Sequence, residues 1–134
     1  MSATSTHFQV PGHERQRGAC LGPDGSAAQV HRVIAMIEGR WKLPILFRLF
    51  EHGSVRMLQL KRDMPGVSQK MLTQHLRELE ADGLVHRREI QGRVRHVDYA
   101  LSAAGHALLP AFRALRHFAD QHPADNPPQA TGAP

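Results

Sequence analysis

Residues 65–85 read PGVSQKMLTQHLRELEADGLV, a turn followed by a long amphipathic segment and a stop signal. The Pro-Gly pair at the start favours a tight turn, and Ser68 is a residue type that caps helix N-termini well. The helix that starts there is expected to run to about Asp82, because Gly83 can adopt the left-handed conformation that ends many helices. These signals predict a turn that leads into a single helix.

The two faces of this predicted helix differ in chemistry. At about 100° per residue, one side gathers the apolar residues: Leu72, Leu76 and Leu79, with Met71 beside them. The opposite side carries hydrogen-bonding residues: Lys70, Thr73, Gln74 and Arg77. Glutamine pairs with adenine, arginine and lysine pair with guanine, and threonine contacts a base edge or a methyl group. Ser68 and Gln69 lie at the helix N-terminus, a position that favours contact with a phosphate.

A second, shorter helix is predicted just before the turn. It covers residues 57–64 and carries Lys61 and Arg62 near its end. A helix, a tight turn and a second helix in this order predict a helix-turn-helix. An ordinary amphipathic helix with a solvated polar face is the alternative, but it does not explain why the neighbouring elements are basic.

A β-hairpin is predicted after the helix. Residues 84–89 and 96–101 form its two strands, and the intervening loop has a glycine at its centre. Arg93 and Arg95 make this loop basic. Arginines on such a wing typically reach phosphates or a narrow minor groove. A basic helix flanked by a basic wing favours DNA as the partner.

Three further helices complete the predicted elements. The first ends near Gly39, and the second runs from about Trp41 to Gly53. The last begins at Ser102, and a kink is expected at Pro110 because proline cannot donate the backbone hydrogen bond of a helix interior. The predicted fold class is therefore mainly α with a small β-hairpin wing, a winged helix-turn-helix.

The predicted domain occupies only part of the chain. Residues 1–26 show no sustained periodicity and are expected to form a flexible N-terminal arm. Residues 27–122 form the DNA-binding and dimerisation domain, and residues 123–134 form a disordered tail rich in proline.

Four segments together resemble the HxlR family of bacterial winged-helix regulators, which are relatives of the MarR type. These segments are IEGRWK (37–42), PGVSQKMLT (65–73), LRELEADGLV (76–85) and VDYALS (97–102). The resemblance covers residues 30–105, more than half of the chain. It implies a homodimer built largely from the first and last helices. Each recognition helix of such a dimer would enter a major groove of a pseudo-palindromic operator.

The chain departs from that family at its cysteine. Many members carry a sensor cysteine just before the first helix, and the corresponding position here is Ala28. Cys20 lies eight residues upstream and is a candidate redox-sensing thiol. An incidental free thiol is the alternative, because a cysteine in a flexible arm lacks the electropositive surroundings that activate thiolates. The wing departs as well, since residues 92–96 lack the prolines common in the family and are more basic.

Composition narrows the class of protein further. The chain has 134 residues, a formal net charge of +5 and a sequence pI of about 10.3, which suit a nucleic-acid partner. A single cysteine excludes an internal disulfide and fits a reducing cytosol. No secretory signal or membrane span is expected, so the predicted location is cytoplasmic. The ten histidines include no close ligand pair and are expected to be scattered over the surface, and neither a metal nor a cofactor is predicted.

The predicted function is sequence-specific DNA binding by a homodimeric transcription regulator, more a repressor than an activator. Its partners are double-stranded DNA, a second copy of the chain and a small-molecule effector or redox signal that the sequence does not identify. A winged-helix module for protein–protein contact is the alternative, since a fold does not fix function. Enzymatic activity through Cys20 is not expected, because no ordered base or glycine-rich phosphate loop accompanies the thiol.

Overall fold

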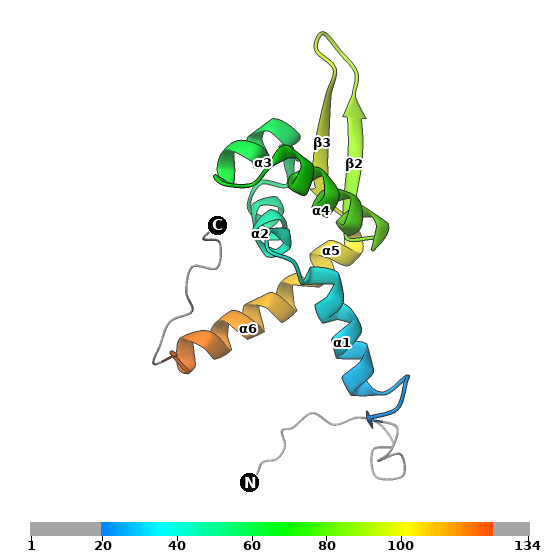
Figure 1. Cartoon of the computed structure of the whole chain (residues 1–134), viewed down its shortest axis with the longest axis vertical. Helices are drawn as coiled ribbons and strands as arrows, with labels where there is room; N and C mark the ends of the chain where they lie inside the picture. Colours follow the sequence, from blue (N-terminus) through cyan, green and yellow to red (C-terminus); the bar gives the residue numbers. More distant parts are fainter. Residues whose placement is uncertain (1–19, 125–134) are drawn as a thin grey trace. The chain divides into compact units, whose positions relative to one another are not determined.

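The computed structural model describes residues 20–124 (Figure 1). The chain divides into two compact units. The first unit ends at Met36 and contains most of helix α1 (Ser26–Ile37). None of the residues of α1 is buried, and the apolar side chains of Val30 and Ile34 are exposed. The predicted arm and tail fall largely outside the described residues.

The second unit begins at Ile37 and holds the remaining elements. In chain order these are α2 (Lys42–His52), β1 (Ser54–Arg56), α3 (Met57–Asp63), α4 (Gln69–Ala81), β2 (Val85–Ile90), β3 (His96–Leu101), α5 (Ala103–Ala107) and α6 (Leu109–Gln121). The predicted fold class is confirmed: the chain is mainly helical, and a β-hairpin follows two helices joined by a turn. Figure 1 shows the β2–β3 hairpin extending well beyond α4.

The sheet contains one strand more than the sequence analysis predicted. Its order is β1-β3-β2, and both pairs are antiparallel. Tyr99 of β3 lies opposite Val55 on one side and Arg87 on the other, so these three residues share a face. β1 was missed because three residues between a helix-ending glycine and the next helix are too few to show an alternating pattern.

Leucines from three helices form most of the core, together with residues of the sheet. The largest fully buried side chains are Ile45, Leu46, Leu49, Leu60, Leu72, Leu76, Leu79 and Val85. Phe112 of α6 is also buried and stacks on Phe47 of α2, with ring centroids 5.5 Å apart. The core therefore holds α2, α3, α4 and the start of α6 around one end of the sheet.

The last predicted helix is broken into two. α5 ends at Ala107, and α6 starts at Leu109, so that Pro110 lies in the first turn of α6. A proline there is tolerated, because the first backbone N–H groups of a helix have no intrahelical acceptor. The expected kink inside a single helix is therefore wrong in detail: the chain changes helix at Leu108, two residues before Pro110. Among residues 20–124, no helix is long and apolar enough to cross a membrane.

Candidate nucleic-acid interface

Both ends of α4 are fixed by local hydrogen bonds. At the start, the Ser68 hydroxyl accepts from the backbone N–H of Met71 at 3.0 Å, as the predicted cap requires. At the end, Gly83 has a φ of +80°. The N–H of Leu84 donates to the carbonyl of Leu79 and that of Gly83 to the carbonyl of Glu80, the pair of bonds that closes a Schellman motif. The sequence folds this segment into one well-defined helix.

The predicted polar face of α4 is exposed, and the leucine face is buried. Leu72, Leu76 and Leu79 are each at most 1% exposed. On the polar face, Thr73 is half-buried and the other predicted base-reading residues are exposed: Lys70, Gln74 and Arg77. Ser68 and Gln69 are also exposed, and the Gln69 amide donates to the Thr73 hydroxyl at 3.4 Å.

His75 lies on the buried face of α4 and was missed as a core residue. It is 8% exposed, whereas the sequence analysis favoured scattered surface histidines. That expectation was wrong for His75, which stands three residues after Leu72 and four before Leu79, within the apolar stripe. Met71, expected beside the leucines, is 40% exposed.

A charged cluster attaches α4 to α2. The Lys42 ammonium is nearly buried and lies 3.0 Å from Oε1 of Glu78. The same carboxylate contacts Nδ1 of His75 at 3.3 Å and accepts from the Gln74 amide at 3.2 Å. Hydrogen bonds from Lys42, then Gln74 and His75, lower the pKa of Glu78 to about 2. Gln74, predicted to read a base, therefore has an intramolecular partner in the free protein.

A second ion pair attaches α3 to α2. The Arg48 guanidinium lies 2.7 Å from Oδ2 of Asp63, and its hydrogen bond lowers the pKa of that carboxyl. This contact fixes the short helix that carries the predicted basic residues. Lys61 is half-buried there, and Arg62 is exposed and donates to Gln59 at 3.3 Å.

The wing presents its predicted arginines at the loop. Arg93 and Arg95 are both exposed between β2 and β3, and Val94 between them is 67% exposed. At the other end of the hairpin, the buried Ser102 hydroxyl donates to the carbonyl of Gly83 at 2.6 Å. The root of the wing is thereby tied to the end of α4.

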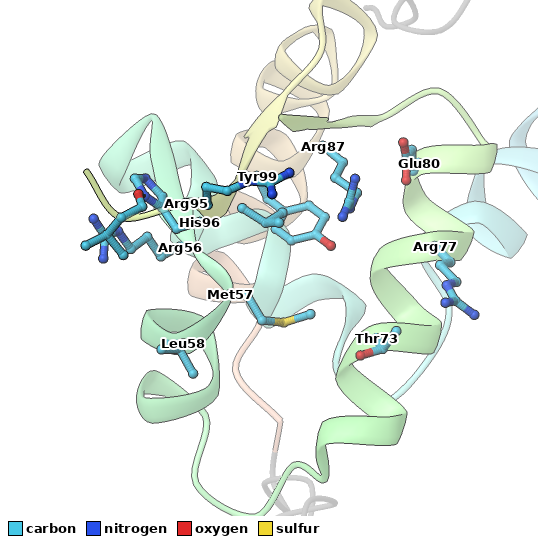
Figure 2. A pocket seen from close by; sticks show the side chains of 12 residues that line it. Arg56, Met57, Leu58, Thr73, Arg77, Glu80, Arg87, Arg95, His96 and Tyr99 are labelled. Atoms are coloured by element: carbon cyan, nitrogen blue, oxygen red, sulfur yellow. The ribbon is translucent and has the colours of Figure 1, made fainter. Parts of the chain in front are cut away.

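A groove of about 640 Å³ lies between α4 and the wing (Figure 2). It is lined by Arg56, Met57, Leu58, Thr73, Arg77, Glu80, Arg87, Val94, Arg95, His96, Val97 and Tyr99. Among these described residues, four arginines face one carboxylate, so the groove is suited to an anion.

The groove brings together only some of the predicted site residues. It joins Thr73 and Arg77 of α4 with Arg95 of the wing. It does not include the other candidates, which are Lys61, Arg62, Ser68, Gln69, Lys70, Gln74 and Arg93. Arg87 and Tyr99 also line the groove and were not among the predicted site residues, although their positions in the two predicted strands could have placed them on one face of the hairpin.

Cys20 lies outside this groove, in the first unit. It is a half-buried free thiol six residues before the start of α1. Within residues 20–124, no group of three or more histidine, cysteine, aspartate or glutamate side chains is placed to hold a metal ion.

Comparisons with known proteins identify a family and a shared fold. The family described as HxlR-like helix-turn-helix matches residues 36–126. A relative from Bacillus subtilis, the HTH-type transcriptional regulator YdzF, is 42% identical over 77 residues, which are 58% of this chain and 71% of the relative.

Two solved structures share the fold. A regulator described as belonging to the MarR family, from Enterococcus faecalis, has a TM-score of 0.68 and 36% identity, and the match covers 71% of this chain and 86% of that chain. The redox regulator HypR in its reduced form has a TM-score of 0.64 and 32% identity, with coverage of 69% and 91%.

Proposed function

The chain belongs to the HxlR-like helix-turn-helix family, and we propose that it is a cytoplasmic transcription regulator that binds specific DNA sequences as a homodimer. In this proposal, α4 enters the major groove and the wing reaches the adjacent minor groove. Binding to a pseudo-palindromic operator represses the neighbouring promoter. No catalytic step is part of the proposal.

The observation that carries this proposal is the exposed polar face of α4. Lys70 and Arg77 are exposed on the side opposite the buried leucines, and both side chains can pair with guanine. The N-terminus of the same helix is free to meet a phosphate. Basic side chains on α3 and the wing add contacts to the DNA backbone, which position the protein without reading sequence.

Exposed apolar side chains support a dimer. On α6, Leu115 and Phe118 are 62% and 63% exposed, and on α1 Val30 and Ile34 are 59% and 48% exposed. Large apolar side chains grouped on helices typically mark contact surfaces. A two-fold dimer would place its two recognition helices one helical turn of DNA apart, about 34 Å.

A module for protein–protein contact is the competing function. Protein interfaces are enriched in aromatic and apolar side chains at their centres and depleted of lysine. The exposed face of α4 carries lysine and glutamine and has no aromatic side chain. The surface beside the wing therefore favours DNA over a protein partner.

Selection of bound duplexes from a random pool at near-physiological salt tests the proposal. We expect an enriched inverted repeat, and the Arg77→Ala variant should lose that enrichment. Recovery of duplexes with no common sequence, bound only at low salt, would argue for the protein-contact function.

The same selection, repeated with a thiol oxidant, tests the redox role of the single cysteine. Cys20 is the only thiol in the chain, so any thiol-dependent response must require it. If oxidation abolishes enrichment of the repeat for the wild-type protein but not for the Cys20→Ser variant, redox sensing is assigned to Cys20. An unchanged selection would leave Cys20 an incidental thiol.

A further inference from the structure

Arg87 lines the groove between α4 and the wing. It lies opposite Tyr99 in the β2–β3 register, so both side chains leave the sheet on the face turned to α4. Figure 2 shows the guanidinium between the Tyr99 ring and α4, and Thr73 lies further along α4 in the lining of the same groove. The Arg87 side chain is 41% exposed, and Tyr99 is 5% exposed. Arg87 is thus a recessed cation that a ligand entering the groove can still reach.

The intramolecular partner of Arg87 is weakly bound. Nη1 donates to Oε2 of Glu89 at 3.2 Å, and the Glu89 side chain is 54% exposed. The hydrogen bond to the Glu89 carboxylate raises the pKa of Arg87, and this effect outweighs the loss of solvation, which lowers it; the Tyr99 hydroxyl raises it further. Exposed ion pairs of this kind add little to stability. The guanidinium is therefore charged and can exchange its partner at low cost.

The chemistry of the groove fits one phosphodiester group better than a base edge. A guanidinium presents parallel N–H donors that match two phosphate oxygens. The hydroxyls of Thr73 and Tyr99 add neutral donors, and Arg77 adds a second cation. This step rests on the proposed function: if α4 lies in the major groove and the wing in the minor groove, the sugar-phosphate strand that separates them must pass between α4 and the wing.

We propose that the groove seats a backbone phosphate of bound DNA on Arg87, Tyr99 and Thr73, and that Glu89 is the competitor displaced when the phosphate enters. Arg87 acts here as a positioning residue: it contacts the same phosphate on every sequence and sets the distance between α4 and the wing. Glu89 lowers the affinity for all DNA, because its contact with Arg87 must be broken first.

The neighbouring Arg88 provides a matched control on the same strand. It leaves the sheet on the opposite face, where its Nη2 donates to the Ser54 hydroxyl at 3.3 Å. Ser54 in turn donates to the Asp98 carboxylate at 3.2 Å. Replacing Arg87 or Arg88 by glutamine removes the same charge one residue apart, so the two variants separate groove contact from net charge.

The first test measures affinity for the selected operator and for an unrelated duplex over a range of salt concentrations. Arg87→Gln should weaken both complexes by about tenfold or more, the loss expected for a hydrogen bond to a charged group. Its salt slope should fall by about 0.9, the change expected for one lost phosphate contact. Arg88→Gln should weaken binding by no more than about threefold, as a screened neighbouring charge does. Equal effects of the two variants would overturn the proposal.

A double-mutant cycle tests the competitor. Glu89→Gln should tighten binding by roughly two- to fivefold, the range set by an exposed ion pair. The gain should disappear when Arg87→Gln is present, because Glu89 acts through Arg87. A gain of the same size in both backgrounds would show that Glu89 repels DNA through general charge and would remove it from the proposal.

Neutral methylphosphonate substitutions, placed one at a time along the operator, locate the phosphate. At one position in each half-site, the neutral substitution should weaken binding by the wild-type protein and leave the affinity of the Arg87→Gln variant unchanged.

Arg87→Lys keeps the charge but loses the paired donors, so this variant should bind DNA with intermediate affinity. It also serves as a second variant in case the glutamine variant misfolds. If the wild-type protein prefers its operator but the effect of every methylphosphonate is independent of Arg87, the proposed phosphate site is wrong and the proposed function is unaffected. If wild-type protein has no preferred sequence, the proposed function fails instead.

Discussion

At the scale of single residues, Arg77 is the cationic side chain of the predicted base-reading face that also lines the groove. It is exposed on α4 and lines the groove beside the wing. Arg77→Ala should cost about 1–3 kcal/mol of operator binding if the side chain reads a guanine, with a smaller loss on unrelated DNA. Fluorescence anisotropy titrations of both duplexes measure the difference. Arg113→Ala, an exposed arginine on α6, is the control for lost charge.

An equal loss on both duplexes would assign Arg77 to the DNA backbone instead. No loss on either duplex, with unfolding unchanged, would mean that α4 presents another face to DNA.

Glu78 makes the stability of the domain depend on pH. Its pKa is lowered to about 2 by Lys42, Gln74 and His75, so the ionised form is favoured in the folded state. A carboxyl with a lowered pKa contributes stability above its unfolded pKa of about 4.3 and loses that contribution as pH falls toward 2. Because Glu78 is 40% exposed, solvent screening reduces the contribution to about 1 kcal/mol.

Glu78→Gln should therefore unfold more easily than wild type at pH 7, and the difference should shrink between about pH 4.5 and 2. Urea unfolding at several pH values measures this. Glu80→Gln, an exposed carboxylate on the same helix, should show no such convergence. If the wild-type protein remains more stable to urea than Glu78→Gln by the same amount at pH 2.5, ionised Glu78 is not the source of the difference in stability.

At the scale of elements, the junction of α5 with the wing leaves no room for a side chain. A Cβ added at Gly105 would collide with the backbone carbonyl of Leu84 and press on Leu101. Helix propensity alone predicts that Gly105→Ala is stabilising by about 1 kcal/mol. The collision reverses the sign, and we expect a net loss of about 1–3 kcal/mol. Thermal unfolding measures it, with Ala104→Ser, an exposed neighbour, as the control. A variant more stable than wild type would show that the junction can open freely.

Elements with strong local signals could be predicted from the sequence. The extent of α4 follows from its cap, its leucine spacing and the glycine after it, and all three signals act within a few residues. The break between α5 and α6, two residues before Pro110, follows from the same kind of local chemistry. β1 could not be predicted, because Ser54–Arg56 becomes a strand only by pairing with β3, more than forty residues later.

Parts of the site that depend on distant contacts could not be predicted either. The contact of Lys42 with Glu78 joins α2 to α4, and nothing near Lys42 in the sequence indicates that its ammonium is nearly buried. The groove has the same origin, because Arg87 and Thr73 meet only when the wing folds beside α4. The sequence shows which residues have side chains suited to DNA. Only the structure shows which of them line the groove and which lie on the exposed face of α4 outside it.

At the scale of the whole molecule, the proposed dimer makes the exposed apolar face of α6 necessary for assembly. Phe118 is 63% exposed there. Phe118→Glu should convert a dimer of twice 14.9 kDa into a monomer, because a buried unpaired charge opposes association. Sedimentation equilibrium measures the mass. His117→Glu adds the same charge at an exposed neighbouring position and should leave the dimer intact. Dimers of equal stability in both variants would place the interface elsewhere.

In the proposed function, the assembled protein recognises a DNA sequence through α4. The most direct measurement is the ratio of dissociation constants for the selected inverted repeat and for the same duplex with both half-sites scrambled, at near-physiological salt. We expect wild-type protein to prefer the repeat by at least about 10³-fold and Arg77→Ala to lose much of that preference. Equal affinity of wild-type protein for the two duplexes would contradict the account.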